Sequence, residues 1–430
     1  MTVLSGRRYR VDFTSDQATF AENIGTTCRS VWNTALEQRR LYGARGSWIS
    51  YREQARQLAD AKASFPWLAQ PPSHTLQQTL MDLDKACTTH GTWNVRWRSA
   101  RSWSPSFRFP DPAQITVQPL NHNNAQVKLP KFGWVRIRWS RPLGGIRSAT
   151  IRRESGRWWI SILVADPDET PEIHAHPQRA VGVDRGVKTL AVTSCGEFYD
   201  QSYASPREIE HCKDLQRRVA GTEKGLNRRK AAVARLNRTL GRVRRRRQDF
   251  TTKVGRTMAR GNSLVVFEAL RIKNMTASAA GTPDQPGRRV RQKSGLNRAI
   301  LDKGWHRLEA ACRSAARRTG SRVVTINPAY TSITCSSCRH VDRRSRESQA
   351  DFRCTACGYR CHADVNAAVN ILTAGRAELG HETRERELGR ANPDNRGRKA
   401  QRQPTAAQRF SPIGLVEIPR CIPREDVNRG

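Results

Sequence analysis

Acidic residues are scarce in this chain. Its 430 residues include 38 Asp and Glu against 76 Lys and Arg, which leaves a formal net charge of +38. Because so few acids cannot balance the basic charge internally, the composition predicts a polyanionic partner, most commonly a nucleic acid. Long apolar runs are also missing, which excludes a transmembrane helix, and the N-terminal MTVLSGRRYR lacks the apolar segment of a signal peptide. We therefore expect a cytoplasmic protein with no membrane partner.

Cysteine is not scarce, since it occurs 11 times, but its spacing does not indicate disulfides. Two CxxC pairs, Cys335 with Cys338 and Cys354 with Cys357, are separated by 15 residues, which is the spacing of a zinc ribbon. The alternative is a set of unligated surface thiols. Four thiolates complete a tetrahedral site and leave no open position, so we expect a structural Zn²⁺ ion. Cys361 and His362 follow directly, but the ligand set is complete without them.

Three carboxylates stand in unusual places. Asp184 lies inside an apolar strand, Glu268 ends the strand SLVVFE, and Asp364 begins a helical run, DVNAAVNIL, just after the ribbon. A buried carboxylate is costly unless it is paired or binds a metal, although Asp184 alone could be a solvated turn residue and Asp364 a helix cap. Three carboxylates on an α/β sheet can hold two Mg²⁺ ions, which support phosphodiester hydrolysis. The residues alone therefore indicate a metal-dependent nuclease.

The chain divides into segments of different character. Residues 7–13 alternate like a strand and are followed by helical patterns. Residues 106–164 then contain several short strands, typical of a small barrel or sandwich that the first strand joins. Residues 166–177 have the composition of a linker, and residues 377–430 are polar enough to predict a disordered basic tail. We expect an α+β protein of several domains.

Residues 206–260 predict a very basic helical hairpin. Val219, Leu226, Val233 and Leu240 recur every seven residues and predict a narrow packing seam. The candidate nucleic-acid-binding residues on the other faces are Arg228, Arg229, Arg235, Arg238, Arg242, Arg244, Arg245, Arg246 and Arg247. A solvated charged helix is the alternative, but acids are too few here to balance the arginines, which favours a bound phosphate backbone.

Four segments carry a resemblance to a known family. In chain order, VGVDRGVKTLAV, VVFEALRIKNMT, NPAYTSITCSSC and CHADVNAAVNIL resemble the RuvC motifs and zinc ribbon of TnpB proteins. These are RNA-guided DNA nucleases encoded by insertion sequences and related to the type V CRISPR effectors. Two positions depart from the family pattern: Arg185 replaces a usual apolar residue, and Ala269 replaces a common aspartate.

The resemblance implies an architecture. Residues 1–170 would form a wedge β-barrel with a helical recognition lobe inserted at about 14–104, and residues 178–330 an RNase H-like RuvC α/β domain that includes the hairpin. The zinc ribbon would occupy residues 331–361 and the last RuvC helix residues 362–376. Asp184, Glu268 and Asp364 would be the catalytic acids, which bind Mg²⁺.

The resemblance also implies a function. The protein would be an RNA-guided DNA endonuclease of a transposable element that cuts double-stranded DNA beside a short adjacent motif, at the prokaryotic nucleoid. Its partners would be a guide RNA with a structured scaffold and the target DNA, with no small-molecule cofactor. Base pairing would select the sequence while the protein holds the nucleic-acid backbones. A CRISPR-associated type V effector, an RNA-guided repressor without cleavage and a transposase remain as alternatives.

Overall fold

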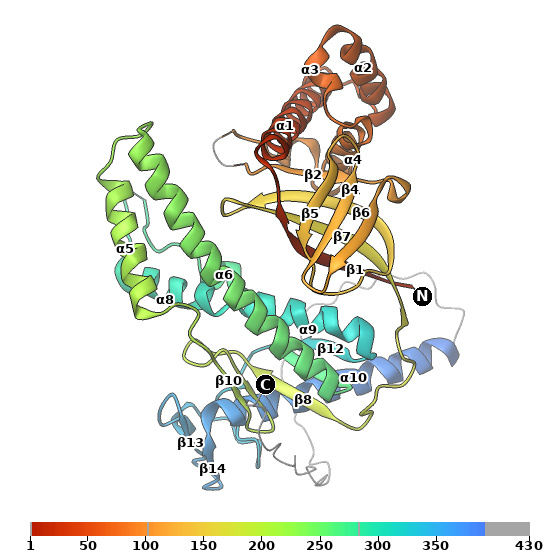
Figure 1. Ribbon diagram of the computed structural model, residues 1–430. Helices are drawn as coiled ribbons and strands as arrows, with labels where there is room; N and C mark the ends of the chain where they lie inside the picture. Colours follow the sequence, from red (N-terminus) through yellow and green to blue (C-terminus); the bar gives the residue numbers. More distant parts are fainter. Residues whose placement is uncertain (1, 101–102, 283, 392–430) are drawn as a thin grey trace. The chain divides into compact units, whose positions relative to one another are not determined.

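A computed structural model of the chain describes residues 2–100, 103–282 and 284–391 (Figure 1). The chain divides into two units. The first consists of residues 1–169 and 204–244, and the second of residues 170–203 and the described residues from 245 onward. Among the helices of the described ranges, none is both long and apolar enough to cross a membrane.

The first unit contains a seven-stranded antiparallel sheet. Its strands are β1 (Thr2–Asp12), β2 (Ser106–Phe109), β3 (Thr116–Asn121), β4 (Asn124–Leu129), β5 (Gly133–Arg138), β6 (Gly145–Glu154) and β7 (Arg157–Glu169). They lie in the order β2-β6-β7-β1-β5-β4-β3. Strand β1 therefore lies inside the sheet, with Tyr9 opposite Ile160 on β7 and Val11 opposite Ile137 on β5. The chain leaves this sheet after β1 and returns to it at β2.

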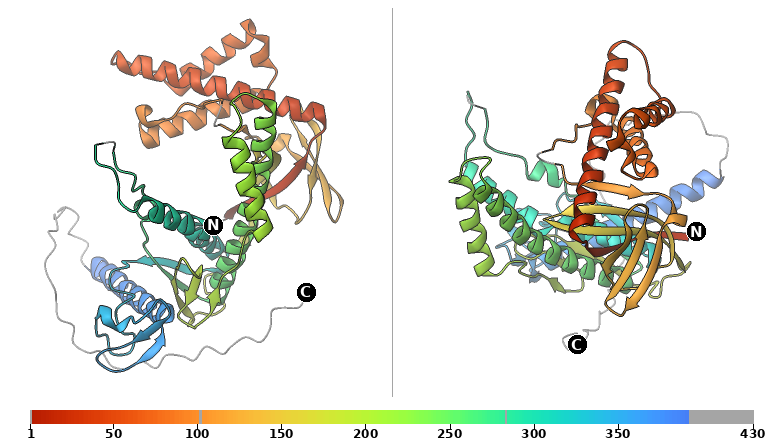
Figure 2. Two further views of the ribbon diagram at one scale, coloured as in Figure 1. Left: turned by 90° about the vertical axis from the view of Figure 1, so that its left-hand side faces the viewer. Right: turned by 45° about the horizontal axis from the view of Figure 1, so that its top comes forward.

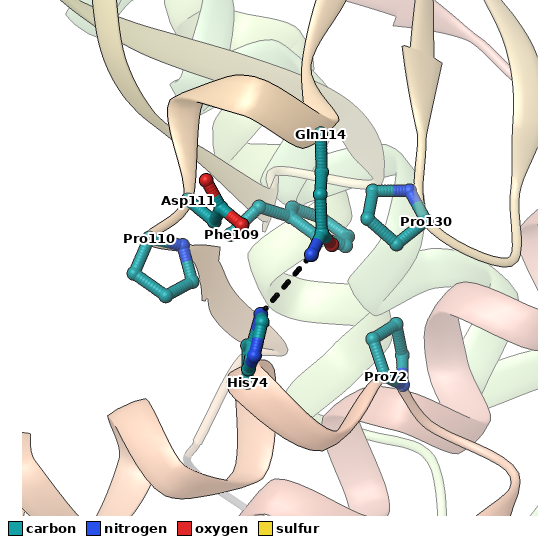
Figure 3. Close-up of a pocket in the computed structure, with 7 residues that line it drawn as sticks. All are labelled: Pro72, His74, Phe109, Pro110, Asp111, Gln114 and Pro130. Atoms are coloured by element: carbon teal, nitrogen blue, oxygen red, sulfur yellow. Dashed lines mark hydrogen bonds between the residues drawn. The ribbon is translucent and has the colours of Figure 1, made fainter.

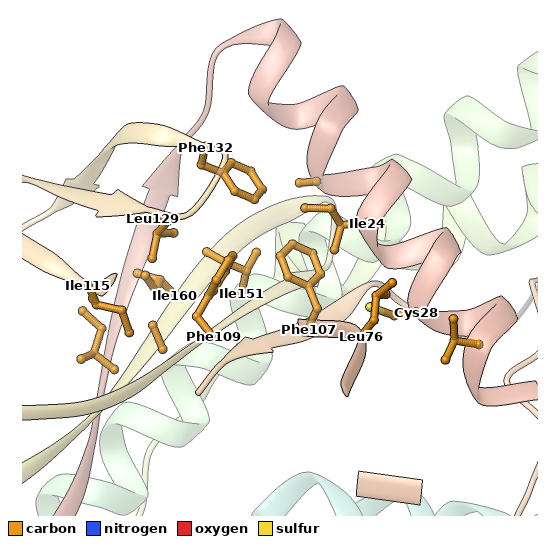
Figure 4. Packing of buried hydrophobic residues seen from close by; sticks show 14 of the residues in the cluster. Ile24, Cys28, Leu76, Phe107, Phe109, Ile115, Leu129, Phe132, Ile151 and Ile160 are labelled. Carbon is orange, nitrogen blue, oxygen red and sulfur yellow. The ribbon is translucent and has the colours of Figure 1, made fainter. Parts of the chain in front are cut away.

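The segment between β1 and β2 is helical. It contains α1 (Ser15–Ala44), α2 (Tyr51–Ser64), α3 (Pro66–Ala69), α4 (Ser73–His90) and the 3-10 turn η1 (Thr92–Asn94), gathered to one side of the sheet (Figure 2). Thr14 starts α1 with a capping box that Gln17 completes. Ile24 and Leu76 of these helices join Phe107 and Ile151 of the sheet in one apolar core (Figure 4). Burial of this shared face therefore holds the helices to the sheet.

The second unit contains a five-stranded mixed sheet in the order β10-β9-β8-β11-β12. Its strands are β8 (Ala180–Asp184), β9 (Ala191–Thr193), β10 (Phe198–Tyr199), β11 (Leu264–Glu268) and β12 (Arg322–Ile326). Strand β11 pairs in parallel with β8 and β12, whereas β9 is antiparallel to β8. The helices of this part are α7 (Ile272–Met275), α8 (Val290–Lys303), α9 (Trp305–Thr319) and α10 (Ala363–Ala391).

Different helices cover the two faces of this sheet. Val181, Val183 and Phe267 share one core with α9 and the end of α6 (Asn227–Gly261). Val266 points to the opposite face, where it packs with Ile371 of α10. Because side chains alternate along a strand, each strand gives one row of residues to each face. A Cβ atom at Gly182 would lie 2.0 Å from the Ala368 carbonyl oxygen, so α10 lies against β8 at backbone distance.

The hairpin consists of α5 (Pro206–Ala220) and α6, whose residues up to 244 belong to the first unit. The predicted seven-residue seam is wrong in part, because Leu226 is 38% exposed and Leu240 is 41% exposed. Leu226 precedes the start of α6 and lies in the turn. Within residues 206–240 the buried positions are instead Leu215, Ala232 and Thr239, so the packed stripe of α6 is rotated by about one residue from the predicted one.

We expected a disordered tail from residue 377 onward, but the first part of this segment is helical. Helix α10 continues to Ala391, well beyond the predicted end at residue 376. The rest of the expected tail, residues 392–430, lies outside the described residues. The ribbon itself has a two-stranded sheet of β13 (Asp351–Arg353) and β14 (Arg360–His362), preceded by the 3-10 turn η3 (Arg343–Ser345).

Candidate active site

The three predicted carboxylates converge on one face of the five-stranded sheet. Asp184 ends β8 two residues after Gly182, and Glu268 ends β11 two residues after Val266. Since Gly182 and Val266 both face α10, the alternation of side chains turns both acids to the same side. Strands β8 and β11 are parallel neighbours, so their carboxyl ends meet at one edge. Asp364 lies in the first turn of α10, on that same face.

Two buried asparagines hold the start of α10 to the ribbon. Asn366 accepts a hydrogen bond from the Ser336 backbone N–H at 2.9 Å and donates to the Thr334 carbonyl at 2.7 Å. Asn370 donates to the carbonyls of Thr331 at 2.9 Å and Thr334 at 2.6 Å. These bonds attach the helix that carries Asp364 to the knuckle of the first CxxC pair. We predicted an apolar stripe here and missed the asparagines, whose four-residue spacing places them on one helix face.

The carboxylates interact electrostatically. Burial, followed by the charges of Glu268 and Asp364, raises the pKa of Asp184 to about 7 from its ordinary 3.8, and Arg346 opposes the rise. Burial also raises the pKa of Glu268. Three negative charges in one buried region repel one another, and a divalent cation relieves that repulsion. The donor set is all oxygen, which is what Mg²⁺ prefers, so the residues fit the predicted ion.

Two further residues contact these acids, and sequence analysis missed both. Thr331, which is buried, donates from its hydroxyl to Glu268 Oε1 at 2.6 Å. Arg346, which lies just after η3 in the ribbon, donates to Asp364 Oδ1 at 3.1 Å. Arg346 is one of several arginines in its segment, and nothing in the local sequence distinguishes it. Thr331 lies in the NPAYTS segment that carried the family resemblance, which was the available signal.

The raised pKa of Asp184 predicts a pH-dependent cost to the metal-free fold. Between about pH 4 and 7 the folded protein binds more protons at this site than the unfolded chain, so the free energy of unfolding falls as pH rises. We expect Asp184→Asn to be more stable than the wild type at pH 8 in EDTA, by on the order of a few kcal/mol, and equally stable near pH 4. Thermal unfolding at both pH values measures this. A variant that is less stable at pH 8 would contradict it.

The four predicted zinc ligands come together. The sulfur atoms of Cys335, Cys338, Cys354 and Cys357 all lie within 4.8 Å of one another. The Sγ atoms of Cys335 and Cys357 are 3.8 Å apart, and those of Cys338 and Cys354 are 3.5 Å apart. Sulfurs at about 2.3 Å from a tetrahedral Zn²⁺ ion lie roughly 3.8 Å from one another, so the set fits zinc.

The neighbouring residues support the zinc site without entering it. Backbone N–H groups of Cys357 and Ala356 lower the pKa of Cys354 to about 6, which favours its thiolate form. Cys361 lies outside the cluster of four sulfurs. His362 accepts a hydrogen bond at Nδ1 from the backbone N–H of Asp364 at 3.2 Å. His362 therefore caps the start of α10, a role that leaves the zinc set unchanged.

The arginines of the basic hairpin fall into two groups, those with protein partners and those without an ion-pair partner in the described part of the chain. Six of the nine predicted arginines contact protein groups. Three form ion pairs: Arg242 with Glu208, Arg244 with Glu154, and Arg247 with Asp302. Two donate to main-chain carbonyls, Arg229 to those of Val219 and Thr222 and Arg246 to that of Tyr203, and Arg245 also has an interaction. Arg228, Arg235 and Arg238 are exposed and have no ion-pair partner within the described ranges. Positions i, i+7 and i+10 lie on one face of a helix. The candidate nucleic-acid stripe is thus these three arginines.

A cavity in the first unit is not a second active site. It is lined by residues of β2, α4 and their neighbouring loops, with His74 Nδ1 lying 3.4 Å from the Gln114 side-chain nitrogen (Figure 3). Its volume is about 10 Å³, which is room for one water molecule. Asp111 at its rim accepts a hydrogen bond from the Ala113 backbone N–H at 3.0 Å, which begins the 3-10 turn η2 (Pro112–Gln114).

Three segments of the chain match described protein families. Residues 161–279 match the family described as "Probable transposase", residues 305–371 match "Cas12f1-like, TNB domain", and residues 1–47 match "Helix-turn-helix domain", a segment that folds here as one strand and one helix. The fold is similar to that of the protein chain in "Cryo-EM structure of the Cas12f1-sgRNA-target DNA complex". The TM-score is 0.52 at 11% identity, and the match covers 86% of this chain and 98% of that chain.

Two curated relatives match over most of their length. The chain is 36% identical over 366 residues to "Putative RNA-guided DNA endonuclease InsQ" of Escherichia coli (strain K12), which covers 82% of this chain and 87% of that protein. It is 29% identical over 380 residues to "Putative RNA-guided DNA endonuclease" of Streptomyces pristinaespiralis, with 86% and 89% covered. The chain combines a mixed sheet that carries buried carboxylates with a four-cysteine ribbon, and its fold places it in the class of Cas12f1-like folds. The chain belongs to the TnpB family, the family of InsQ.

Proposed function

We propose that this chain is an RNA-guided DNA endonuclease that cuts target DNA at the site of Asp184, Glu268 and Asp364. The observation that carries the proposal is the convergence of these acids in a chain of the TnpB family. Burial, followed by the charges of Glu268 and Asp364, raises the pKa of Asp184. The five-stranded sheet would be the RNase H-like RuvC domain. The seven-stranded sheet would be the wedge barrel, and the helices from α1 to α4 the recognition lobe.

The acids would hold Mg²⁺ through their carboxylate oxygens. When bound, two such ions activate a water molecule and stabilise the leaving 3′ oxygen in phosphodiester hydrolysis. Thr331 fixes one oxygen of Glu268 through its hydroxyl, which orients the carboxylate. Arg346 is half-buried beside Asp364 and would supply positive charge to the scissile phosphate. Base pairing with the guide would choose the sequence, so the protein needs only to hold backbones and read a short motif.

The function is tested by the RNA that the protein carries. The chain is expressed beside its native flanking DNA and purified, and the bound RNA is sequenced. We expect one discrete RNA with a structured body and a variable 3′ segment. The complex should then cut double-stranded DNA that matches this segment, and only with Mg²⁺ present. A mixture of unrelated RNA fragments, with no guided cutting, would overturn the proposal and favour the plain nuclease or transposase.

The three-arginine stripe should contribute to binding mainly through phosphate charge. We expect the triple variant Arg228→Ala/Arg235→Ala/Arg238→Ala to bind RNA more weakly. The slope of log affinity against log salt should become shallower by about 2 to 3, since each phosphate contact contributes roughly 0.7–0.9. Affinity measured across a salt series checks this.

A matched control removes basic side chains that are already paired. Lys213 and Arg217 on α5 pair with Glu210 and Asp214, so Lys213→Ala/Arg217→Ala should leave the slope nearly unchanged. Equal loss of slope in the control and the triple variant would assign the binding to general charge and remove any special role of the stripe.

A further inference from the structure

A buried arginine lies next to the first catalytic acid. The Arg185 side chain is 1% exposed, although it follows Asp184 directly and is the residue that departs from the apolar type usual in the family. Its guanidinium donates to the main-chain carbonyl of Glu268 and, at 3.0 Å, to Glu309 Oε2 on α9. It also lies over the Phe267 ring, 5.2 Å from the centroid. A charge so deeply buried needs partners, and one of them, the Glu268 carbonyl, belongs to a candidate catalytic residue.

Arg185 contacts the Glu268 carbonyl on the side of β11 where Glu268 has no partner residue in the strand pairing. On one side, Glu268 is in register with Ile326 of β12, and the Ala269 N–H donates to the Ile326 carbonyl at 2.8 Å. On the other side, the pairing of β11 with β8 ends at Phe267 and Val183, one residue before the two acids. The Arg185 side chain therefore connects β8 to the end of β11 just beyond the last ladder pair.

Glu309 is itself held in place. Arg313 donates to Glu309 Oε1 at 3.1 Å and to the Val323 carbonyl of β12 at 2.9 Å. Trp305, at the start of α9, donates from its indole N–H to the Gly186 carbonyl at 3.0 Å. Helix α9 thus fixes the segment just after Asp184 at two points. The chain of contacts runs from β8 through α9 to β12, the strand on the far side of Glu268.

We propose that Arg185 and Glu309 form a positioning pair that holds the main chain of Glu268 beside Asp184, so that the two carboxylates can bind one divalent cation. The proposal rests on the proposed function. The two charges oppose each other, so the pair fixes the geometry while adding little net charge to the acidic region. Groups that orient metal ligands from behind typically change metal affinity 10- to 100-fold when removed.

The test separates folding from positioning. Arg185→Leu takes away the buried partner of Glu309, which keeps only the more exposed Arg313, and should lower the melting temperature. Arg185→Leu/Glu309→Leu removes both charges together and should recover much of that loss, because apolar replacements of a buried pair are often neutral. Mn²⁺ binding to the RNA-free full-length protein is followed by electron paramagnetic resonance, and the signal lost in Asp184→Asn defines binding at this site. Guided cleavage is measured as a function of Mg²⁺ concentration.

We expect both leucine variants to bind Mn²⁺ at least about tenfold more weakly and to need correspondingly more Mg²⁺ for cleavage. Arg39→Leu is the matched control: its side chain is also 1% exposed and pairs with Asp84 at 2.8 Å, within the first unit. It should lose stability but keep the Mn²⁺ affinity. If the leucine variants do not fold, Arg185→Lys tests the proposal instead. Lysine keeps the positive charge but cannot donate to Glu309 and to the Glu268 carbonyl with the geometry of a guanidinium, so this variant should also bind Mn²⁺ at least about tenfold more weakly.

Wild-type Mn²⁺ affinity in the double variant or in Arg185→Lys would overturn the proposal. So would an equal loss of affinity in Arg39→Leu, because it would trace the effect to general destabilisation. Failure of the wild type to cut guided DNA would instead overturn the proposed function, while the Mn²⁺ comparison would still decide the role of the pair.

Discussion

Asp184→Ala is expected to abolish guided DNA cleavage while the protein still binds its RNA and target. Asp184 lies at the end of β8 on the face that Glu268 and Asp364 share, and their charges interact with its own. Removing it would take two ligand oxygens from the proposed Mg²⁺ ions. The transition-state stabilisation that such ions supply is worth several kcal/mol, so the rate should fall by roughly a thousandfold or more. Binding should persist or tighten slightly, because a negative charge is lost beside the phosphate backbone.

The measurement pairs single-turnover cleavage with DNA affinity in the absence of divalent ions. Asp249→Ala is a suitable control, since Asp249 is an exposed acid whose partner is Lys253 on the same helix. It should cut at the wild-type rate. Full cleavage by Asp184→Ala would remove the metal-site assignment altogether, whereas loss of both cleavage and binding would indicate a folding defect.

Cys335→Ser is expected to release zinc and, with it, activity. Cys335 is fully buried at the centre of the ribbon, where Phe352 and Ala363 pack against it. Zinc binding supplies on the order of 10 kcal/mol to small ribbon folds, so three remaining thiolates should not keep the ribbon folded at ordinary zinc levels. The knuckle bonds to Asn366 and Asn370 would then be lost, and the start of α10 with Asp364 would no longer be fixed.

Zinc content measured by native mass spectrometry, together with cleavage, checks this. The control is Cys361→Ser, since Cys361 lies on the same ribbon but outside the group of four sulfurs. It should retain both zinc and activity. A Cys335→Ser protein that keeps zinc and cuts DNA would show that the ribbon does not depend on this thiolate.

Sequence alone predicted the parts whose signal is local. The strands between residues 106 and 164 alternate, the two CxxC pairs are spaced for a metal, and Asp184 stands in an otherwise apolar strand, so each was recognisable without knowledge of the fold. The meeting of Asp184 and Glu268 was also predictable, because the carboxyl ends of neighbouring parallel strands meet at one edge.

The remaining contacts depend on how distant segments meet. Arg346 looks like its neighbouring arginines, and only the folded ribbon brings it to Asp364. Similarly, Arg185 appeared as a departure from the family, yet its partner Glu309 is 124 residues away. The seam of α6 was misplaced because residues seven apart do not by themselves reveal which neighbouring position faces the partner helix.

The asparagine contacts between the ribbon and α10 have a thermodynamic consequence. Asn366 and Asn370 make the position of Asp364 depend on the order of the zinc knuckle. Because the start of α10 is shared by the two sites, binding of Zn²⁺ to the thiolates and of Mg²⁺ to the acids would be coupled. If zinc increases the affinity of the acidic site for Mg²⁺ by some factor, Mg²⁺ must increase the affinity of the thiolates for zinc by the same factor. A zinc ion held by these cysteines would then also affect the acidic site, and a zinc-selective chelator should need a higher concentration to remove it when Mg²⁺ is present.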